Sequence, residues 1–261
     1  MPGVRAVVEL ARTSTSAPAV AVVADSWWRA RTALAGLAIQ WHEGEHATLD
    51  SALQREAYAA LLANGSARAY EQVGDANAVL ASAKRVVEAT YYAPYLAHAT
   101  MEPINCTALV KDGRCEVWVG NQAPTLVRWF AATAANVPSK AVTVHTPFLG
   151  GGFGRRAEMD VVVEAAAIAA RLQGAPVQLI WSREEDLQHD VYRPMALAKF
   201  RCALDASGAI AAWHNRIVGQ SCTQELTARL LPAAASDLMK DKTTVEGAFD
   251  LPYSMPDRLV E

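Results

Sequence analysis

Short apolar runs alternate with polar breaks over the first fifty residues. Two runs with β-strand character, Val4–Leu10 and Ala19–Ala24, are separated by a hydroxyl-rich stretch, and an Asp-Ser pair that favours helix N-caps follows the second. We therefore expect a helix over residues 27–37 and a further strand over residues 36–42. The resulting β-β-α-β unit is too small to form an independent domain.

The next forty residues predict helices joined by a polar segment. Residues 49–62 carry apolar side chains at helical spacing. The Asn-Gly pair that ends at Gly65 predicts that the helix stops there with a residue in the left-handed conformation. A polar stretch over 65–74 is typical of a linker. Asp75 then favours the start of a second helix through Val87, which leads into an aromatic segment.

The pattern after residue 104 mixes strand, helix and hairpin signals. Asp112 and Gly113 predict a two-residue hairpin turn that places Cys115 opposite Val110. A glycine-rich loop lies between a strand signal and a long Ala/Val/Ile helix signal. The further elements expected are a helix over 124–135, a strand over 141–146, a helix over 159–172, a strand over 177–181, a short acidic helix after Ser182, paired strands over 197–204 and 210–218, and the start of a strand at 258–261.

Composition narrows the classes of function. The chain has 261 residues, 52% hydrophobic content and a net charge of −3, so it can bury a sizeable core and has no basic run to neutralise nucleic-acid phosphates. No apolar stretch reaches the roughly 20 residues that span a bilayer, and no secretion leader is recognisable at the start. The four cysteines never form C-x-x-C, so we expect reduced thiols and no metal cluster held by this chain.

The strongest local signal is the glycine-rich loop at 150–156. Missing β-carbons allow close approach of a ligand and leave amides available to an anion, although the same cluster can be a tight turn. The dinucleotide pattern G-x-G-x-x-G fails because Arg155 or Ala157 stands where the third glycine is needed, and the P-loop pattern fails as well. Arg155 and Arg156 can pair with a phosphate or form a solvated charged pair at a helix start.

Two further constellations carry less specific chemistry. His42 and His46 match H-E-x-x-H, which on a helix holds zinc with the glutamate as base, but the central Gly44 and the preceding strand signal favour a solvated acidic loop. His98 and Glu102 follow an aromatic segment, where a carboxylate beside proline is often a turn former or part of a structural ion pair. The G-x-S-x-G elbow that positions a nucleophilic serine is absent, so the sequence does not support a serine hydrolase.

Taken together and in order, six stretches resemble the large subunit of the xanthine dehydrogenase/aldehyde oxidoreductase family, most closely the isoquinoline 1-oxidoreductase beta-subunit type. The resemblance covers nearly the whole chain, and the ordered set is specific although each stretch alone is weak. The stretches are MPGVRAVV (1–8), VVADSWWRA (22–30), YLAHATMEP (95–103), GNQ (120–122), FLGGGFGRRAE (148–158) and IWSREED (180–186).

The resemblance implies a set of cofactor-binding residues. Gln122 stands where the family has a glutamine that hydrogen-bonds an oxo ligand of molybdenum. Gly151, Gly152, Phe153 and Gly154 match the loop that packs beside the metal's ligands, where hydrogen bonds orient a cofactor that the protein does not ligate covalently. We also expect Arg155, the next residue in the chain, to bind the cofactor. Without a cofactor, Gln122 would be an ordinary strand-end amide and Phe153 an ordinary core residue.

This sequence also departs from the family's pattern. Many relatives have a substrate-binding glutamate after this loop, whereas the aligned position here is Ala157, and Glu158 comes one step later. Recognition of a purine-type substrate is therefore not implied. The family's general-base glutamate and second cofactor-binding half would lie beyond Glu261, so we expect no catalytic residue in this chain and regard it as a fragment that is inactive alone.

The implied architecture is α+β with three parts: a partial hammerhead-like unit over 1–47, a helical bridge over 48–78, and the first part of a molybdopterin-binding domain over 79–261. The implied enzyme hydroxylates an N-heterocycle or oxidises an aldehyde with water-derived oxygen. Its cofactor would be molybdenum–molybdopterin, in the cytosine dinucleotide form.

The implied partners are a small subunit with a [2Fe–2S] cluster, a downstream electron acceptor such as a cytochrome, and a small aromatic or aldehyde substrate. The family favours the periplasm, with the cytoplasm as the alternative location. Two other functions stay open at this point: a stand-alone, non-catalytic binding or assembly module, and a zinc hydrolase that uses His42 and His46.

Overall fold

The computed structural model describes residues 1–44, 46–234 and 241–261. These residues form two compact units, each built from two separate stretches of chain. Unit 1 comprises Met1–His42 and Ala97–Tyr192, and unit 2 comprises Glu43–Leu96 and Arg193–Glu261. The three-part division at residues 47 and 78 stays a prediction, and the two compact units follow different boundaries because residues 1–42 pack with residues 97–192.

Unit 1 begins with the predicted hairpin and helix. Strands β1 (Val4–Leu10) and β2 (Ala19–Ala24) pair antiparallel in a sheet of their own. Helix α1 (Trp27–Ala35) follows, and the Ser26 side chain accepts a hydrogen bond from the Arg29 amide as its N-cap. The prediction of a strand over 36–42 is wrong: this stretch has no regular structure, because no strand among the described residues pairs with it.

The second sheet of unit 1 has four strands in the order β7-β6-β5-β8. The β5–β6 hairpin turns through Asp112 (φ 49°) and Gly113 (φ 71°), and it pairs Val110 with Cys115 as predicted. Strand β7 runs parallel to β6, and β8 runs antiparallel to β5. The strands are β5 (Asn105–Lys111), β6 (Arg114–Trp118), β7 (Val142–His145) and β8 (Val177–Ile180).

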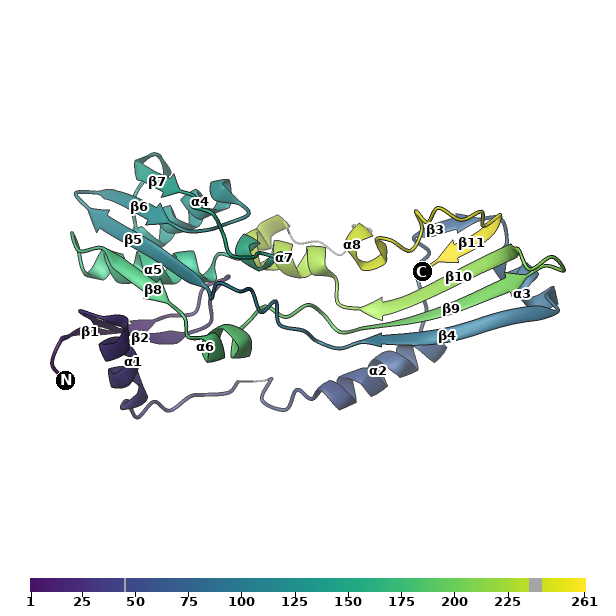
Figure 1. The fold of residues 1–261 in the computed structure, drawn as a ribbon, viewed down its shortest axis with the longest axis horizontal. Helices are drawn as coiled ribbons and strands as arrows, with labels where there is room; N and C mark the ends of the chain where they lie inside the picture. Colours follow the sequence, from purple (N-terminus) through teal and green to yellow (C-terminus); the bar gives the residue numbers. More distant parts are fainter. Residues whose placement is uncertain (45, 235–240) are drawn as a thin grey trace. The chain divides into compact units, whose positions relative to one another are not determined.

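Two helices pack together beside this sheet (Figure 1). Helix α4 (Pro124–Ala135) has the bounds that the sequence predicts, with proline at its start and Asn136 in the left-handed conformation at its end. Helix α5 (Asp160–Arg171) is buried over most of its length, as its continuous Ala/Val/Ile pattern requires, and it contacts α4 and β5. A short acidic helix, α6 (Arg183–Gln188), is capped by Ser182 as predicted.

Unit 2 contains a five-stranded sheet in the order β3-β11-β10-β9-β4, with helices α2 (Ser51–Asn64) and α3 (Ala76–Ser82) packed against it. Strands β9 and β10 form the predicted hairpin, and β11, at the predicted strand start, lies parallel to β10. The strands are β3 (Glu71–Val73), β4 (Arg85–Ala93), β9 (Ala196–Leu204), β10 (Ile210–Gly219) and β11 (Asp257–Val260).

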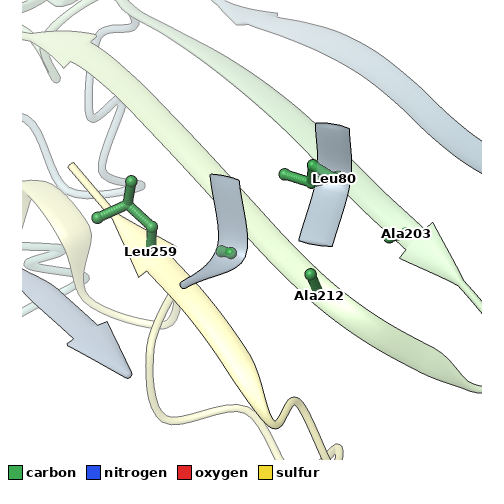
Figure 2. Close-up of a cluster of buried hydrophobic side chains, with 5 residues drawn as sticks. Leu80, Ala203, Ala212 and Leu259 are labelled. Carbon is green, nitrogen blue, oxygen red and sulfur yellow. The ribbon is translucent and has the colours of Figure 1, made fainter. Parts of the chain in front are cut away.

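One core cluster of unit 2 lies where α3 meets the sheet, and a second lies where α2 meets β9. Leu80 is 3% exposed and belongs to a buried cluster with Ala203 of β9, Ala212 of β10 and Leu259 of β11, all labelled in Figure 2. Small alanines on the strands let the helix approach closely, so the leucine fills the space between the two layers. The sheet and α3 therefore depend on each other for burial.

Several local predictions in unit 2 are wrong. Gly65 ends α2 in an extended conformation (φ −69°, ψ 154°) rather than a left-handed one. The second helix ends at Ser82, because the residues from Arg85 onward pair with β9 along its whole length. Strand β3 lies inside the segment predicted as a linker. The sequence pattern did not predict the helices α7 (Cys222–Leu230) and α8 (Lys242–Val245) or the 3-10 turn η3 (Pro232–Ala234). In unit 1 it did not predict the 3-10 turns η1 (Ser139–Ala141) and η2 (Arg155–Ala157).

Among the described residues, no helix combines the length and the apolar character needed to cross a bilayer.

Replacing Leu80 with alanine should lower the free energy of unfolding by about 3 kcal/mol, because the truncation leaves a cavity between α3 and the sheet. The matched control is Leu53→Ala on α2, where the side chain is 63% exposed and the expected change is within about 0.5 kcal/mol. Urea unfolding followed by circular dichroism measures both. Equal losses in the two variants would contradict this assignment of the core.

Candidate functional site

The glycine-rich loop of unit 1 has an unusual backbone. Gly151 (φ +104°) and Gly154 (φ +100°) occupy a region that glycine tolerates, but Phe153 between them also has a positive φ of +55°. A bulky residue adopts this conformation only where its surroundings impose it, and such positions gather at functional sites. The Phe153 ring is 76% exposed, so the interpretation of Phe153 as an ordinary core residue is wrong.

Gln122 lies directly against this loop. Its Oε1 accepts a hydrogen bond from the Gly154 amide at 3.2 Å. A β-carbon at Gly152 would lie 2.7 Å from the same oxygen, so only glycine leaves the Gln122 side chain in this position. The structure therefore brings together the glutamine and the glycines that the sequence singled out, although they are about thirty residues apart in the chain.

The loop also has amides without acceptors. Within the part of the chain that the structure describes, no group accepts a hydrogen bond from the N–H of Gly151, Gly152 or Phe153. Gly152 is buried, and a buried unpaired amide costs free energy comparable to a lost hydrogen bond. Three successive unpaired donors are a suitable arrangement for a ligand that carries acceptor atoms.

Glu102 fixes the start of the loop. Its Oε2 accepts hydrogen bonds from the Gly150 amide at 2.8 Å and from Arg156 Nη2 at 3.0 Å, and its Oε1 accepts one from Asn105 at 2.9 Å. Partial burial raises the pKa of Glu102, but these hydrogen bonds and the Arg156 charge outweigh the burial, so the net pKa lies below its usual range. Glu102 is thus a member of a structural ion pair, one of the two roles the sequence suggested.

Arg155 fixes the end of the loop from inside the unit. The residue is 2% exposed, and its guanidinium contacts both oxygens of Asp160, at 3.0 and 2.6 Å, and one oxygen of Asp190, at 2.8 Å. Arg156 is 3% exposed as well, so the interpretation of this pair as solvated charges is wrong. Because Arg155 is buried and its charge is paired with the two aspartates, the geometry gives no support to a role for Arg155 in binding a cofactor.

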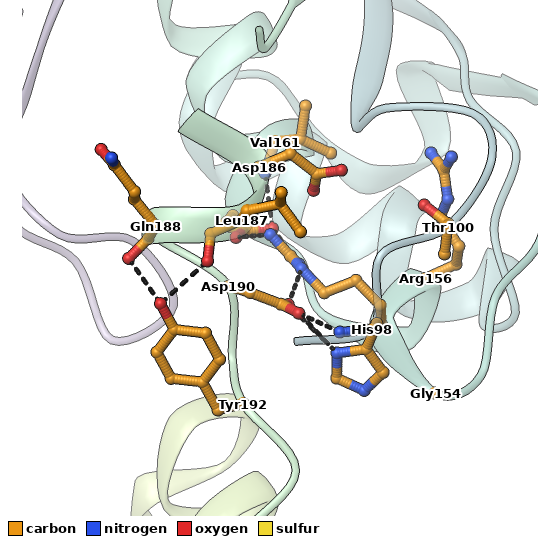
Figure 3. Close-up of polar contacts among 12 residues, drawn as sticks. His98, Thr100, Gly154, Arg156, Val161, Asp186, Leu187, Gln188, Asp190 and Tyr192 are labelled. Carbon is orange, nitrogen blue, oxygen red and sulfur yellow. Dashed lines mark hydrogen bonds and ion pairs between the residues drawn. The ribbon is translucent and has the colours of Figure 1, made fainter. Parts of the chain in front are cut away.

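His98 and Asp190 form a second support beside the loop. The Asp190 side chain is 2% exposed and accepts hydrogen bonds from the His98 amide at 2.5 Å and from His98 Nδ1 at 2.9 Å (Figure 3). The other ring nitrogen, Nε2, lies 3.9 Å from the place where a β-carbon on Gly154 would stand. Sequence reasoning missed Asp190, since a single aspartate at the end of an acidic helix matches no motif.

A buried glutamate connects α5 with the N-terminal hairpin of unit 1. Glu164 is 7% exposed and accepts hydrogen bonds from Ser16 Oγ at 2.8 Å and from Trp181 Nε1 at 3.1 Å. Burial, with the nearby charge of Asp160, raises the pKa of Glu164 from 4.5 to about 7. Near neutral pH this carboxyl group is therefore partly protonated in the folded protein.

The remaining sequence candidates lie elsewhere or lack the required geometry. Residues 41–44 have no regular structure and His46 lies in a turn, so the helix that a zinc-binding H-E-x-x-H motif requires is not formed; Glu45 falls outside the described residues. Within the described ranges no cluster of three or more His, Cys, Asp or Glu could hold a metal ion. Ala157 lies in η2, and Glu158 is buried at 8% exposure.

Fold and site together define an α+β chain with a glycine-rich loop that offers amide donors to a ligand. The sequence profile of the family described as "Molybdopterin cofactor-binding domain" matches residues 62–241. The chain belongs to this family. The matched residues include Gln122, the glycine-rich loop, His98 and Asp190.

Relatives and solved structures agree with this membership. The chain is 33% identical over 194 residues to "Membrane-bound aldehyde dehydrogenase [pyrroloquinoline-quinone]" of Gluconacetobacter polyoxogenes, covering 74% of this chain and 25% of that protein. It is 32% identical over 242 residues to "Isoquinoline 1-oxidoreductase subunit beta" of Brevundimonas diminuta, covering 89% of this chain and 30% of the relative. The chain thus spans between a quarter and a third of the length of these relatives.

The fold resembles that of solved oxidoreductases. The structure of quinoline 2-oxidoreductase from Pseudomonas putida 86 superposes with a TM-score of 0.63 at 19% identity, covering 83% of this chain and 32% of that one. The aldehyde oxidoreductase of Desulfovibrio gigas gives a TM-score of 0.60 at 20% identity, covering 84% of this chain and 28% of that one. These likenesses confirm the α+β fold class.

Replacing Glu164 with glutamine should remove a pH dependence of stability. Because folding raises the Glu164 pKa from 4.5 to about 7, the unfolded chain ionises first, and wild type loses stability from this group as pH rises through that window. The difference in unfolding free energy, variant minus wild type, should therefore increase by about 2 to 3 kcal/mol between pH 5 and pH 8. Urea titrations at several pH values measure it.

The control for this measurement is Glu56→Gln on the exposed surface of α2, which removes the same charge without removing a buried group. Its difference from wild type should stay constant to within about 0.5 kcal/mol over the same pH range. A flat difference for Glu164→Gln as well would show that the Glu164 carboxyl is ionised in the folded protein at pH 5.

Proposed function

We propose that this chain provides part of a molybdenum–molybdopterin site in an oxidoreductase that hydroxylates an N-heterocycle or oxidises an aldehyde with water-derived oxygen. The observation that carries the proposal is the glycine-rich loop, whose three unpaired amides lie beside Gln122. Family membership supports the cofactor, and the names of the two relatives, an aldehyde dehydrogenase and an isoquinoline oxidoreductase subunit, support the two classes of substrate.

The residues present fit such a cofactor. The amides of Gly151, Gly152 and Phe153 can donate to acceptor atoms of the group, and the missing β-carbon of Gly152 lets the group approach the backbone. The Gln122 Oε1 accepts a hydrogen bond from Gly154, which orients the side-chain amide. Its Nε2 has no partner among the described residues, so both of its N–H groups can donate to a ligand. When bound, the cofactor would supply the redox centre that takes electrons from the substrate.

The supporting residues orient the donors rather than contact the cofactor. Glu102 and Arg156 hold the first glycine of the loop, and Arg155 holds its last turn through the two buried aspartates. Binding sites gain affinity when donors are fixed before the ligand arrives, because the ordering entropy is already lost. Arg155 therefore belongs to this support in our proposal.

The proposal for the whole protein goes further than this chain. The relative named as a subunit beta supports a partner subunit. For this partner we propose a small protein with a [2Fe–2S] cluster, and we propose a further electron acceptor, such as a cytochrome, downstream of it. We propose the cytosine dinucleotide form of the cofactor, a general base in the part of the relatives' length that this chain does not match, and a periplasmic location.

The direct test is to produce the full-length polypeptide with its small subunit in a host that makes molybdopterin. Molybdenum and released pterin are then measured per chain, and oxidation of aldehydes and N-heterocycles is followed with a dye as electron acceptor. We expect about one molybdenum per chain and turnover of at least one of the two substrate classes. A purified complex without molybdenum or pterin would instead favour a non-catalytic assembly module.

Gly152→Ala should reduce the molybdenum content at least fivefold, because the added β-carbon would displace Gln122 and narrow the approach to the loop amides. The matched control in the same unit is Gly36→Ala after α1, where φ is −90° and the new β-carbon would make only an ordinary contact with Ala33. The control should keep wild-type molybdenum. Equal metal content in the two variants would count against the loop as the binding site.

A further inference from the structure

His98 presents an accessible ring nitrogen to the glycine-rich loop. Its side chain is 16% exposed, and Nε2 makes no hydrogen bond with any group in the described part of the chain. This nitrogen lies 3.9 Å from the position of a β-carbon on Gly154, and the neighbouring Thr100 side chain lies 3.4 Å from that position on Gly151. The segment 98–102 therefore runs along the same loop that offers the unpaired amides.

The orientation of the imidazole is strongly determined. Asp190 accepts hydrogen bonds from both the His98 amide and Nδ1, and Arg155 neutralises the same carboxylate at 2.8 Å, as Figure 3 shows for His98 and Asp190. Ala99, the next residue, has a positive φ of +47°, a conformation that costs free energy and is kept only where surrounding contacts impose it. A side chain that only filled space would need none of these constraints.

The hydrogen bond to Asp190 also determines what Nε2 can do. Because Nδ1–H donates to the carboxylate, Nε2 of the neutral ring has a free lone pair and acts as an acceptor. The glycine-rich loop supplies donors from the amides of Gly151, Gly152 and Phe153. The loop and the segment 98–102 therefore offer donors and an acceptor to one ligand. A pterin carries N–H donors beside carbonyl acceptors and matches this combination.

We propose that His98 is a cofactor-binding residue whose Nε2 accepts a hydrogen bond from an N–H or O–H of the group held by the glycine-rich loop. Asp190 is the positioning residue that selects the tautomer and fixes the ring. This inference rests on the proposed function and adds a side-chain acceptor to the amide donors of the loop. None of the motifs that suggested the cofactor assigned a role to either residue.

Two substitutions separate a ligand-binding role from a structural one. His98→Gln places an amide oxygen or nitrogen near the position of Nε2 and loses the side-chain hydrogen bond to Asp190. His98→Asn keeps an N–H near the position of Nδ1 and loses the group that faces the loop. A ligand-binding role predicts that glutamine rescues cofactor retention, and a structural role predicts that asparagine does.

The experiment measures molybdenum and pterin per chain in the full-length complex after extensive gel filtration, with melting temperatures as a second readout. We expect His98→Gln to keep cofactor within about twofold of wild type and His98→Asn to lose it by about fivefold to tenfold, the effect of one lost hydrogen bond. Melting temperatures of the cofactor-free forms should agree within about 2 °C.

The outcomes distinguish this inference from the function on which it rests. Retention in the asparagine variant, or equal retention or equal loss in both variants, would overturn the role of His98 while wild type still carries molybdenum. A wild-type complex that carries neither molybdenum nor pterin would instead overturn the proposed function itself.

Discussion

The buried ion pairs of Arg155 hold the site together. A guanidinium removed from water costs several kcal/mol unless its charge is paired, and here Asp160 and Asp190 pair it, with two hydrogen bonds to Asp160. Through Asp160 the end of the glycine-rich loop is tied to the start of α5, and through Asp190 it is tied to His98. Loss of this arginine would remove the positive charge that faces the buried Asp160 and Asp190 carboxylates. The end of the loop and the start of α5 therefore depend on it.

Those fixed ends explain how the loop keeps a strained backbone. Phe153 and Ala99 both have positive φ values, which cost of order 1–3 kcal/mol each for residues with a side chain. Glu102 holds the opposite end of the loop through the Gly150 amide, so the segment cannot relax by sliding. In this strained conformation three loop amides have no acceptor. A ligand that accepts hydrogen bonds from these amides would offset the free-energy cost of the conformation.

The site residues lie within unit 1, while unit 2 depends mainly on the packing of α2 and α3 against a sheet. The family match at residues 62–241 includes parts of both units: the glycine-rich loop of unit 1 and the strands β3, β4, β9 and β10 of unit 2. The Leu80 cluster and the Arg155 ion pairs therefore stabilise different parts of the same fold, one by apolar burial and the other by paired charges.

The sequence alone determined the elements whose signals are local. Period, caps and turn chemistry suffice for Val4–Leu10, for Pro124–Ala135 and for the hairpin at Asp112, since each depends on residues within a few positions. Tertiary pairing decided what local signals could not: residues 36–42 found no partner strand, and the segment after Ser82 became a strand because β9 was available.

The same division holds at the site. The family resemblance placed Gln122 and the loop together, but Asp190 lies 92 residues from His98, and only the folded chain brings their side chains into contact. The burial of Arg155 likewise depends on the packing around it. A charged residue is most often exposed to solvent, and the sequence around Arg155 does not predict that two aspartates pair with it in the interior.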